Sequence, residues 1–294
     1  MGGDPASSQR PGINDFQTVG GVYGTQGVPS PYNTPGQRYG AVSWTDHDGN
    51  FWLFGGFGYI GTEFGDLNDL WKYDPSAKEW EWVSGSNTFA CPRGTTNRCG
   101  VSGVYGTLGT PDAGNVPGGR DGASGFIDAA GNLWMFGGFG YGSGQVTEFS
   151  DGELNDLWKF NPTSNQWTWM GGPSSPGQVQ SAVFGTKGLF AAGNMPGIFS
   201  KAASWTDNNG DFWVFGTYNG DTELWEYDVS LNEWAWIGGD ITCTLTSNCT
   251  QITNYGNLGS PAPDNFPGPR RDSAAWTDRA GNLWMFGGNG GMNE

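Results

Sequence analysis

Short apolar runs separated by polar turns recur at long intervals along this chain. Four segments share one pattern, in which an apolar run, a turn of the form Asp-x-x-Gly and a second apolar run follow one another. They are RYGAVSWTDHDGNFWLF (38–54), RDGASGFIDAAGNLWMF (120–136), FSKAASWTDNNGDFWVF (199–215) and RRDSAAWTDRAGNLWMF (270–286). Asp caps such a turn through its own backbone and Gly supplies a positive φ, so each segment predicts a tight β-hairpin.

Three of the four segments continue into a second recurring half. A Leu-Trp stretch such as LWKYD (70–74) leads to a Trp-x-Trp stretch such as WEWV (80–83). The two Trp of each such pair point to one face, because side chains alternate with period two in a strand. In the first copy the pattern therefore predicts four strands, at residues 41–46, 51–56, 70–74 and 80–83.

A four-stranded meander with Gly-Gly after its second strand resembles the kelch repeat. The matching residues are Gly55-Gly56 with Trp71, Tyr73 and Trp80, then Gly137-Gly138 with Trp158, Phe160 and Trp167, and finally Gly287-Gly288. The third copy departs from the pattern, with Gly216-Thr217. The resemblance implies an all-β fold, a kelch-like β-propeller of four-stranded antiparallel blades related to the central domain of galactose oxidase.

The repeats divide the chain into five parts of one propeller domain. Residues 1–37 form an N-terminal segment with an expected strand and a linker. Repeats 1, 2 and 3 cover 38–119, 120–198 and 199–269, and residues 270–294 form a partial fourth repeat with two strands. Three interpretations of the fourth repeat stay open, namely a fragment of a longer propeller, a small ring with a degenerate or split last blade, and an edge completed by a neighbouring subunit.

The linkers between repeats carry a motif of their own. VYGTQG (22–27), VYGTLG (104–109), VFGTKG (183–188) and NYGNLG (254–259) each precede a Pro-Gly step and the next repeat. Because they recur, we expect ordered loops and not flexible tethers. Loops of this kind are the natural place for recognition of a protein or carbohydrate ligand.

Composition and charge narrow the class of partner. The chain has 294 residues, is 15% aromatic with 16 Trp, and has a formal net charge of −16. So much aromatic surface predicts a folded core, and the negative charge disfavours binding to nucleic acid or anionic membranes. No stretch approaches the ~18 apolar residues that a membrane helix needs, so no membrane insertion is expected.

Four cysteines fall in two close pairs in the linkers. Cys91 with Cys99 and Cys243 with Cys249 lack the spacing of zinc ligands, and we expect two local disulfides. Paired cysteines indicate an oxidising compartment, so the expected location is extracellular or at the cell surface. Asn248 begins an Asn-x-Thr sequon and is a candidate glycosylation site.

Candidate chemistry is sparse. The copper radical oxidases that share the kelch-like fold need two imidazole ligands, whereas this chain has one histidine, His47. Carboxylates recur at equivalent repeat positions, which favours an architectural role over catalysis. We therefore expect no catalytic residues, metal or other cofactor. Arg38, Arg120 and Arg270 share one repeat position and form either an anion-binding site or pairs within their own repeats.

The sequence as a whole predicts a non-catalytic extracellular binding or structural module. One alternative is a self-assembling subunit of an extracellular filament or surface layer, a homo-oligomer joined through the open blade edge. Another alternative is a fragment of a larger propeller enzyme. The propeller scaffold itself names no ligand.

Overall fold

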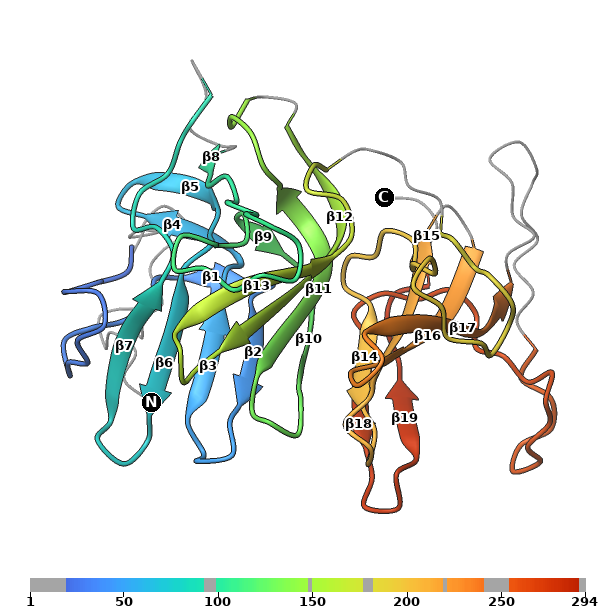
Figure 1. Ribbon diagram of the computed structural model, residues 1–294. Helices are drawn as coiled ribbons and strands as arrows, with labels where there is room; N and C mark the ends of the chain where they lie inside the picture. The colour runs from blue at the N-terminus through green and yellow to red at the C-terminus, as the bar shows by residue number, and fades with distance from the viewer. Residues whose placement is uncertain are drawn as a thin grey trace, which may run out of the picture. The chain divides into compact units, whose positions relative to one another are not determined.

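The computed structural model describes residues 20–92, 99–147, 150–176, 182–218, 221–240 and 254–290 (Figure 1). Within these ranges the chain is all-β, with several four-stranded sheets, and it contains no helix that could cross a membrane. It divides into two compact units, unit 1 (Met1–Gln178) and unit 2 (Val179–Glu294). The sheets agree with a propeller-like fold, in which four-stranded antiparallel sheets are the blades.

Repeat 1 forms the predicted meander in unit 1. Its sheet has the order β2-β3-β6-β7, and every neighbouring pair is antiparallel. The strands are β2 (Val42–Thr45), β3 (Phe51–Phe54), β6 (Leu70–Asp74) and β7 (Glu79–Ser84). The hairpin turn is confirmed, since Asp46 Oδ1 accepts hydrogen bonds from the amides of Asp48 and Asn50.

A second sheet in repeat 1 was not foreseen from the sequence. It has the order β1-β4-β5-β8 and comprises β1 (Arg38–Tyr39), β4 (Phe57–Ile60), β5 (Glu63–Asp66) and β8 (Cys99–Gly100). The predicted Cys91–Cys99 disulfide is confirmed, and it ties β8 to the preceding loop. A disulfide is compatible with an extracellular protein.

In repeat 2 the equivalents of the two repeat 1 sheets share continuous strands and form one sheet. Its sheet has the order β10-β11-β12-β13, with β9 pairing with β11. The strands are β9 (Arg120–Asp121), β10 (Ser124–Ile127), β11 (Leu133–Tyr141), β12 (Asp151–Asn161) and β13 (Gln166–Gly171). The β11–β12 register shifts between Phe136 and Gly138, where Gly137 and Gly138 have φ of 68° and 96°. The Gly-Gly motif thus makes a β-bulge that only glycine adopts without strain.

Unit 2 holds repeat 3 and a two-stranded fourth repeat. Repeat 3 is the sheet β14-β15-β16-β17, with β14 (Ala203–Thr206), β15 (Phe212–Tyr218), β16 (Asp221–Asp228) and β17 (Glu233–Asp240). Its β15–β16 register runs without a shift, which explains why Thr217 stands where the other copies have glycine. The fourth repeat is the hairpin β18 (Ala274–Thr277) with β19 (Leu283–Phe286).

Adjacent repeats pack face to face within each unit. The core of unit 1 joins the two sheets through Trp, Phe and Leu side chains, and β2 lies beside β10. In unit 2, β14 lies beside β18, and Trp205 packs with Leu283 and Met285. One hydrogen bond recurs in both units, from Trp44 Nε1 to the Trp134 carbonyl at 3.1 Å and from Trp205 Nε1 to the Trp284 carbonyl at 2.7 Å.

The linker motifs fold into four similar loops, each closed by a β-bridge. They are loop 1 (22–34), loop 2 (104–116), loop 3 (183–195) and loop 4 (254–266). Loops 1, 2 and 3 cover the fourth strand of the repeat that follows them in sequence. In loop 1 the Gly27 amide donates to the Trp82 carbonyl at 2.8 Å, and Asn33 Nδ2 donates to the Trp80 carbonyl at 3.0 Å. The loops thereby cover edge strands that would otherwise be open to another chain.

Candidate binding site

Repeats 1 and 2 each contain a buried cluster of Arg, Asp, Tyr and Trp. In repeat 2, Arg120 forms a two-point ion pair with Asp156, with nitrogen–oxygen distances of 2.5 and 2.8 Å. Asp156 Oδ2 also accepts hydrogen bonds from Tyr105 Oη at 2.6 Å and Trp158 Nε1 at 2.7 Å. The carboxylate is therefore the centre at which loop 2, β9 and β12 meet.

Repeat 1 reproduces this cluster atom for atom. Arg38 pairs with Asp69 at 2.6 and 2.9 Å, and the same carboxylate accepts hydrogen bonds from Tyr23 and Trp71, each at 2.7 Å. Burial raises the pKa of Tyr23, and the neighbouring carboxylate raises it further, so its hydroxyl stays protonated and donates. The guanidinium groups of Arg38 and Arg120 are thus engaged by acids and carbonyls of their own repeats.

The buried Arg120 keeps its positive charge because it is paired with the carboxylate of Asp156. Burial lowers the pKa of Arg120, but the ion pair with Asp156 outweighs this, and the pKa lies above its ordinary value. A charge this deeply buried is tolerated only when it is paired. Arginine, tyrosine and acid therefore form one interdependent group.

Repeat 3 shows what happens when the arginine is absent. Phe199 stands at the arginine position, and Phe184 replaces the loop tyrosine and stacks on Trp225. Glu223 replaces the aspartate and accepts from Trp225 Nε1 at 2.7 Å and from the Gly197 amide at 3.3 Å. The arginine and the tyrosine are thus lost together.

Repeat 4 keeps the arginine and the tyrosine without an acid among the described residues. Arg270 takes the pose of Arg120, since it donates to the carbonyls of Gly268 and Gly287 at 3.1 and 3.2 Å. Its Nη2 donates to Tyr255 Oη at 3.1 Å, where repeats 1 and 2 place a carboxylate. Tyr255 is 70% exposed, against 8% for Tyr23 and 6% for Tyr105.

A hollow of about 350 Å³ opens beside these two side chains. Tyr255 and Arg270 line it together with Gly268, Pro269, Gly287, Gly288 and Gly290. Among the described strands, the adjoining β19 pairs with β18 alone. Phe286 at its end is 74% exposed, whereas the equivalent Phe54 and Phe136 are fully buried. The fourth repeat therefore presents a cationic hollow next to an open, apolar strand edge, which we call the open face.

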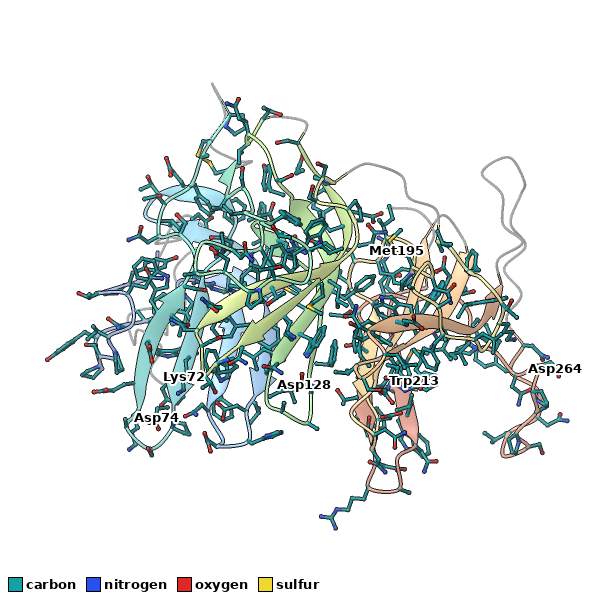
Figure 2. All side chains as sticks on the ribbon, in the orientation of Figure 1. Lys72, Asp74, Asp128, Met195, Trp213 and Asp264 are labelled. Atoms are coloured by element: carbon teal, nitrogen blue, oxygen red, sulfur yellow. A yellow bond between two sulfur atoms is a disulfide. The ribbon has the colours of Figure 1, made fainter. Side chains whose placement is uncertain are left out.

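A separate acidic cluster lies on repeat 3. Oxygens of Asp207, Asp211 and Glu226 lie within 4.8 Å of one another, an arrangement that could hold a hard cation such as calcium. In repeats 1 and 2 the position of Glu226 is a lysine. One of them, Lys72, is labelled in Figure 2, and its Nζ lies 5.5 Å from the centre of the Trp52 ring. In repeat 3 the partner across the strands is Trp213, also labelled in Figure 2. Burial raises the pKa of Glu226 to about 7, and the neighbouring aspartates add to this.

Replacing Glu226 by lysine is expected to stabilise unit 2 at neutral and alkaline pH. Because its folded pKa lies above the ordinary value of 4.5, wild-type stability falls as the pH rises through about 7. The gain at pH 8 should be about 1 kcal/mol or less, because the cluster is partly exposed. Thermal unfolding between about pH 5 and pH 8 measures it. The control D48K makes an equal charge change in an exposed turn and should keep the pH dependence of the wild type. If the stability of E226K falls with pH in parallel with that of the wild type, the prediction is contradicted.

Another unexplained carboxyl lies in unit 1. Asp66 on β5 is buried, and its Oδ1 has no hydrogen-bond partner among the described residues. Burial raises its pKa to about 8, with further contributions from Asp121 and Asp151. Asp66 is thus held largely in its protonated form at neutral pH, and no pattern in the sequence indicates this.

The remaining predicted residues fall in three places. The disulfide cysteines Cys91 and Cys99 lie in unit 1, as described. Cys243, Cys249 and the sequon residue Asn248 lie outside the described residues, as do residues 1–19 of the N-terminal segment. His47 is exposed in the β2–β3 turn. Sequence reasoning identified the arginine position but not the paired tyrosine, although both recur with the repeat.

No protein-family model and no curated protein matches this sequence. Among solved structures the chain is similar to the structure of YjhT, at 16% identity and a TM-score of 0.47, covering 84% of this chain and 58% of that one. It is also similar to a fungal alcohol oxidase of the AA5 family in complex with copper, at 15% identity and a TM-score of 0.35, covering 89% of this chain and 51% of that one. Because both TM-scores lie below 0.5, neither similarity decides fold or function.

The donor set of this chain does not fit a copper site of the galactose oxidase type. Such a site uses two imidazoles, and the sequence contains one histidine. That histidine is exposed in a hairpin turn, and Cys91 and Cys99 are joined to each other. We derive no copper chemistry for this chain.

Proposed function

We propose that this chain is a non-catalytic extracellular binding or structural module, built on a kelch-like propeller, that binds polypeptide at its open face. The observation that carries the proposal is the contrast between repeats. Trp284 and Phe286 are 49% and 74% exposed on β19, while Trp52 and Phe54 at the same positions are buried. Exposed apolar edges next to unpaired strands are typical of strand addition by a partner.

Two further observations support the kelch-like and extracellular parts of the proposal. The Gly-Gly bulge and the four-stranded antiparallel sheets agree with the resemblance found in the sequence. The Cys91–Cys99 disulfide agrees with an oxidising compartment. In favour of a non-catalytic role, the recurring acids Asp69 and Asp156 are already bound by arginine, tyrosine and tryptophan.

Self-assembly is a second candidate function, favoured by the edge of β19 that pairs with none of the described strands. An edge strand is a template for another chain, including a second copy. In that case the particle mass would be a multiple of the 31.4 kDa chain.

Sedimentation velocity over a series of concentrations tests the open face. We expect the wild-type chain to associate, and F286K to stay a single 31.4 kDa particle with unchanged stability, because Phe286 is exposed and a lysine blocks edge pairing. L231K, which changes an exposed leucine in the β16–β17 turn, is the matched control and should behave like wild type. Equal association of F286K and wild type would rule out this edge as the surface. A strictly monomeric wild type would remove self-assembly and leave binding of a different polypeptide.

A further inference from the structure

We infer that Asp66 is the proton-operated latch of a flap in repeat 1, which stays closed while Asp66 carries a proton and is driven open when the proton is lost. The flap is the second sheet of repeat 1, with the order β1-β4-β5-β8, and it lies above the blade sheet of that repeat in Figure 1. It belongs to unit 1, and the inference goes beyond the proposed function because it involves neither the open face nor the fourth repeat.

The flap is a separate sheet in repeat 1, whereas repeat 2 has no such division. On one side β3 ends at Phe54 and β4 begins at Phe57, and on the other β5 ends at Asp66 and β6 begins at Leu70. In repeat 2 the strands β11 and β12 continue through the corresponding positions. The flap can therefore part from its blade without breaking the strand ladder of either sheet, which makes it a two-state element.

Asp66 lies where the flap meets repeat 2. Its neighbours across the flap are Phe57 of β4 and Gly100 of β8, which carry no charge. Its main-chain carbonyl lies so close to Gly119, the residue before β9, that a Cβ at that position would collide with the oxygen. The Gly119 amide in turn donates to the Val101 carbonyl, just after β8, at 2.8 Å. The closed flap thus places Asp66 against the chain that leads into repeat 2.

The side chain of Asp66 is buried in this junction without the partners that a carboxylate needs. It is 3% exposed, and its Oδ1 has no hydrogen-bond partner in the part of the chain that the structure describes. The charged and titratable groups that act on it come from β1, β9 and β12, and they are Tyr39, Arg120, Asp121 and Asp151. Two of these are acids that repel a further negative charge, and Arg120 is already bound by Asp156. Because an uncompensated buried charge is strongly disfavoured, the closed flap requires the neutral acid.

Opening of the flap changes the proton affinity of Asp66. In the closed flap, burial together with Asp121 and Asp151 raises the pKa of Asp66 from 3.8 to about 8, against an opposing effect of Arg120. In the open flap the carboxyl returns to water and to its ordinary pKa of 3.8. Between these two values the closed flap binds more protons than the open one, so closure weakens as the pH rises through this range and becomes constant above about pH 8. The equilibrium constant for opening rises by at most about tenfold per pH unit.

Glu153 holds the same position in repeat 2 and provides an internal comparison. Gly-Asp-Leu-Asn at 65–68 corresponds to Gly-Glu-Leu-Asn at 152–155. Glu153 is half-buried and lies inside the continuous strand β12, opposite Phe139 of β11. An acid at this position is thus common to both repeats, while full burial at the end of a separate sheet distinguishes Asp66. E153Q is therefore the matched control for D66N.

Hydrogen exchange of the intact chain between about pH 5 and pH 9 tests the latch, with each rate divided by that of an unstructured peptide to remove the pH dependence of the exchange chemistry. In wild type we expect the amides of β4, β5 and β8 to exchange faster by up to about tenfold per pH unit until about pH 8 and to level off above it, while those of β2, β3, β6 and β7 stay unchanged. D66N, which is neutral at every pH and nearly equal in volume, should abolish this dependence, and E153Q should keep it. By NMR, the carboxyl carbon of Asp66 in wild type should titrate with a midpoint of about 8, a measurement that needs no variant.

Three results would overturn the inference. A titration midpoint below about 5 would show that the closed flap holds Asp66 in its ionised form. The same pH dependence of exchange in D66N as in wild type would assign it to a different acid, such as Asp121 or Asp151. A midpoint of about 8 with flap exchange that does not change with pH would show that Asp66 binds a proton without acting as a latch.

Discussion

Replacing Asp156 by asparagine is expected to lower the free energy of unfolding of unit 1 by about 3–5 kcal/mol. Arg120 is 1% exposed, and Asp156 is its only carboxylate partner within hydrogen-bonding distance among the described residues. The amide would leave the guanidinium charge uncompensated and would turn an N–H donor toward Arg120, Tyr105 or Trp158, which are all donors to this position. Urea unfolding monitored by hydrogen exchange of β11, β12 and β13 measures the loss.

The exposed ion pair between Lys201 and Asp272 provides the comparison. Its side chains are 39% and 62% exposed at a separation of 4.0 Å, so D272N should cost less than about 1 kcal/mol. D69N in repeat 1 should reproduce the large effect, because the cluster is the same. A loss for D156N as small as that for D272N would mean that water or another acid compensates Arg120.

Trp205→Ala is expected to release the β18–β19 hairpin from repeat 3 while β15, β16 and β17 stay folded. Trp205 is buried between the two repeats, and its indole N–H holds the Trp284 carbonyl. Truncating a buried tryptophan costs about 3–5 kcal/mol, and an isolated two-stranded hairpin is marginally stable in water. Hydrogen exchange should therefore accelerate in β18 and β19 before it does so in β16.

Trp276 is the matched control, because it occupies the same repeat position one blade later. It is 47% exposed, and its ring stacks on Trp284 without a neighbouring sheet among the described residues. Trp276→Ala should cost far less than W205A and leave β18 attached. Similar exchange rates for the two variants would show that the interface depends on Ala203, Phe215 and Met285 and not on the Trp205 side chain.

The sheets were predictable because the sequence repeats its local signals. The turn at Asp46, the Leu-Trp strand at 70–74 and the Trp-x-Trp strand at 80–83 all lie where the pattern placed them, to within one or two residues. The extra sheet of repeat 1 was missed, although Phe57–Ile60 and Glu63–Asp66 flank a Gly-Thr turn that could have identified it. That hairpin is short and occurs once, so no repeat drew attention to it.

The candidate site was less predictable, because its side chains are far apart in the sequence and only the fold brings them together. Arg38 and Asp69 are 31 residues apart, and Tyr23 reaches the same acid from 46 residues away. Their meeting depends on loop 1 folding over its own repeat, which no local pattern reveals. The raised pKa of Asp66 likewise follows from its burial and from Asp121 and Asp151, which only the fold brings near it.

The docking of the loops has a consequence for how the chain can be divided. Loops 1, 2 and 3 each precede in sequence the blade whose fourth strand they cover. The segment that folds together therefore runs from the loop to that fourth strand, as in residues 22–84 or 104–171. Cuts at residues 38 or 120 separate a blade from the loop that covers its fourth strand. Cuts just before residues 22, 104 or 183 keep the loop and the blade together. Grafts, permutations and consensus blades made from this protein should begin at the valine whose bridge closes the loop and not at the first strand.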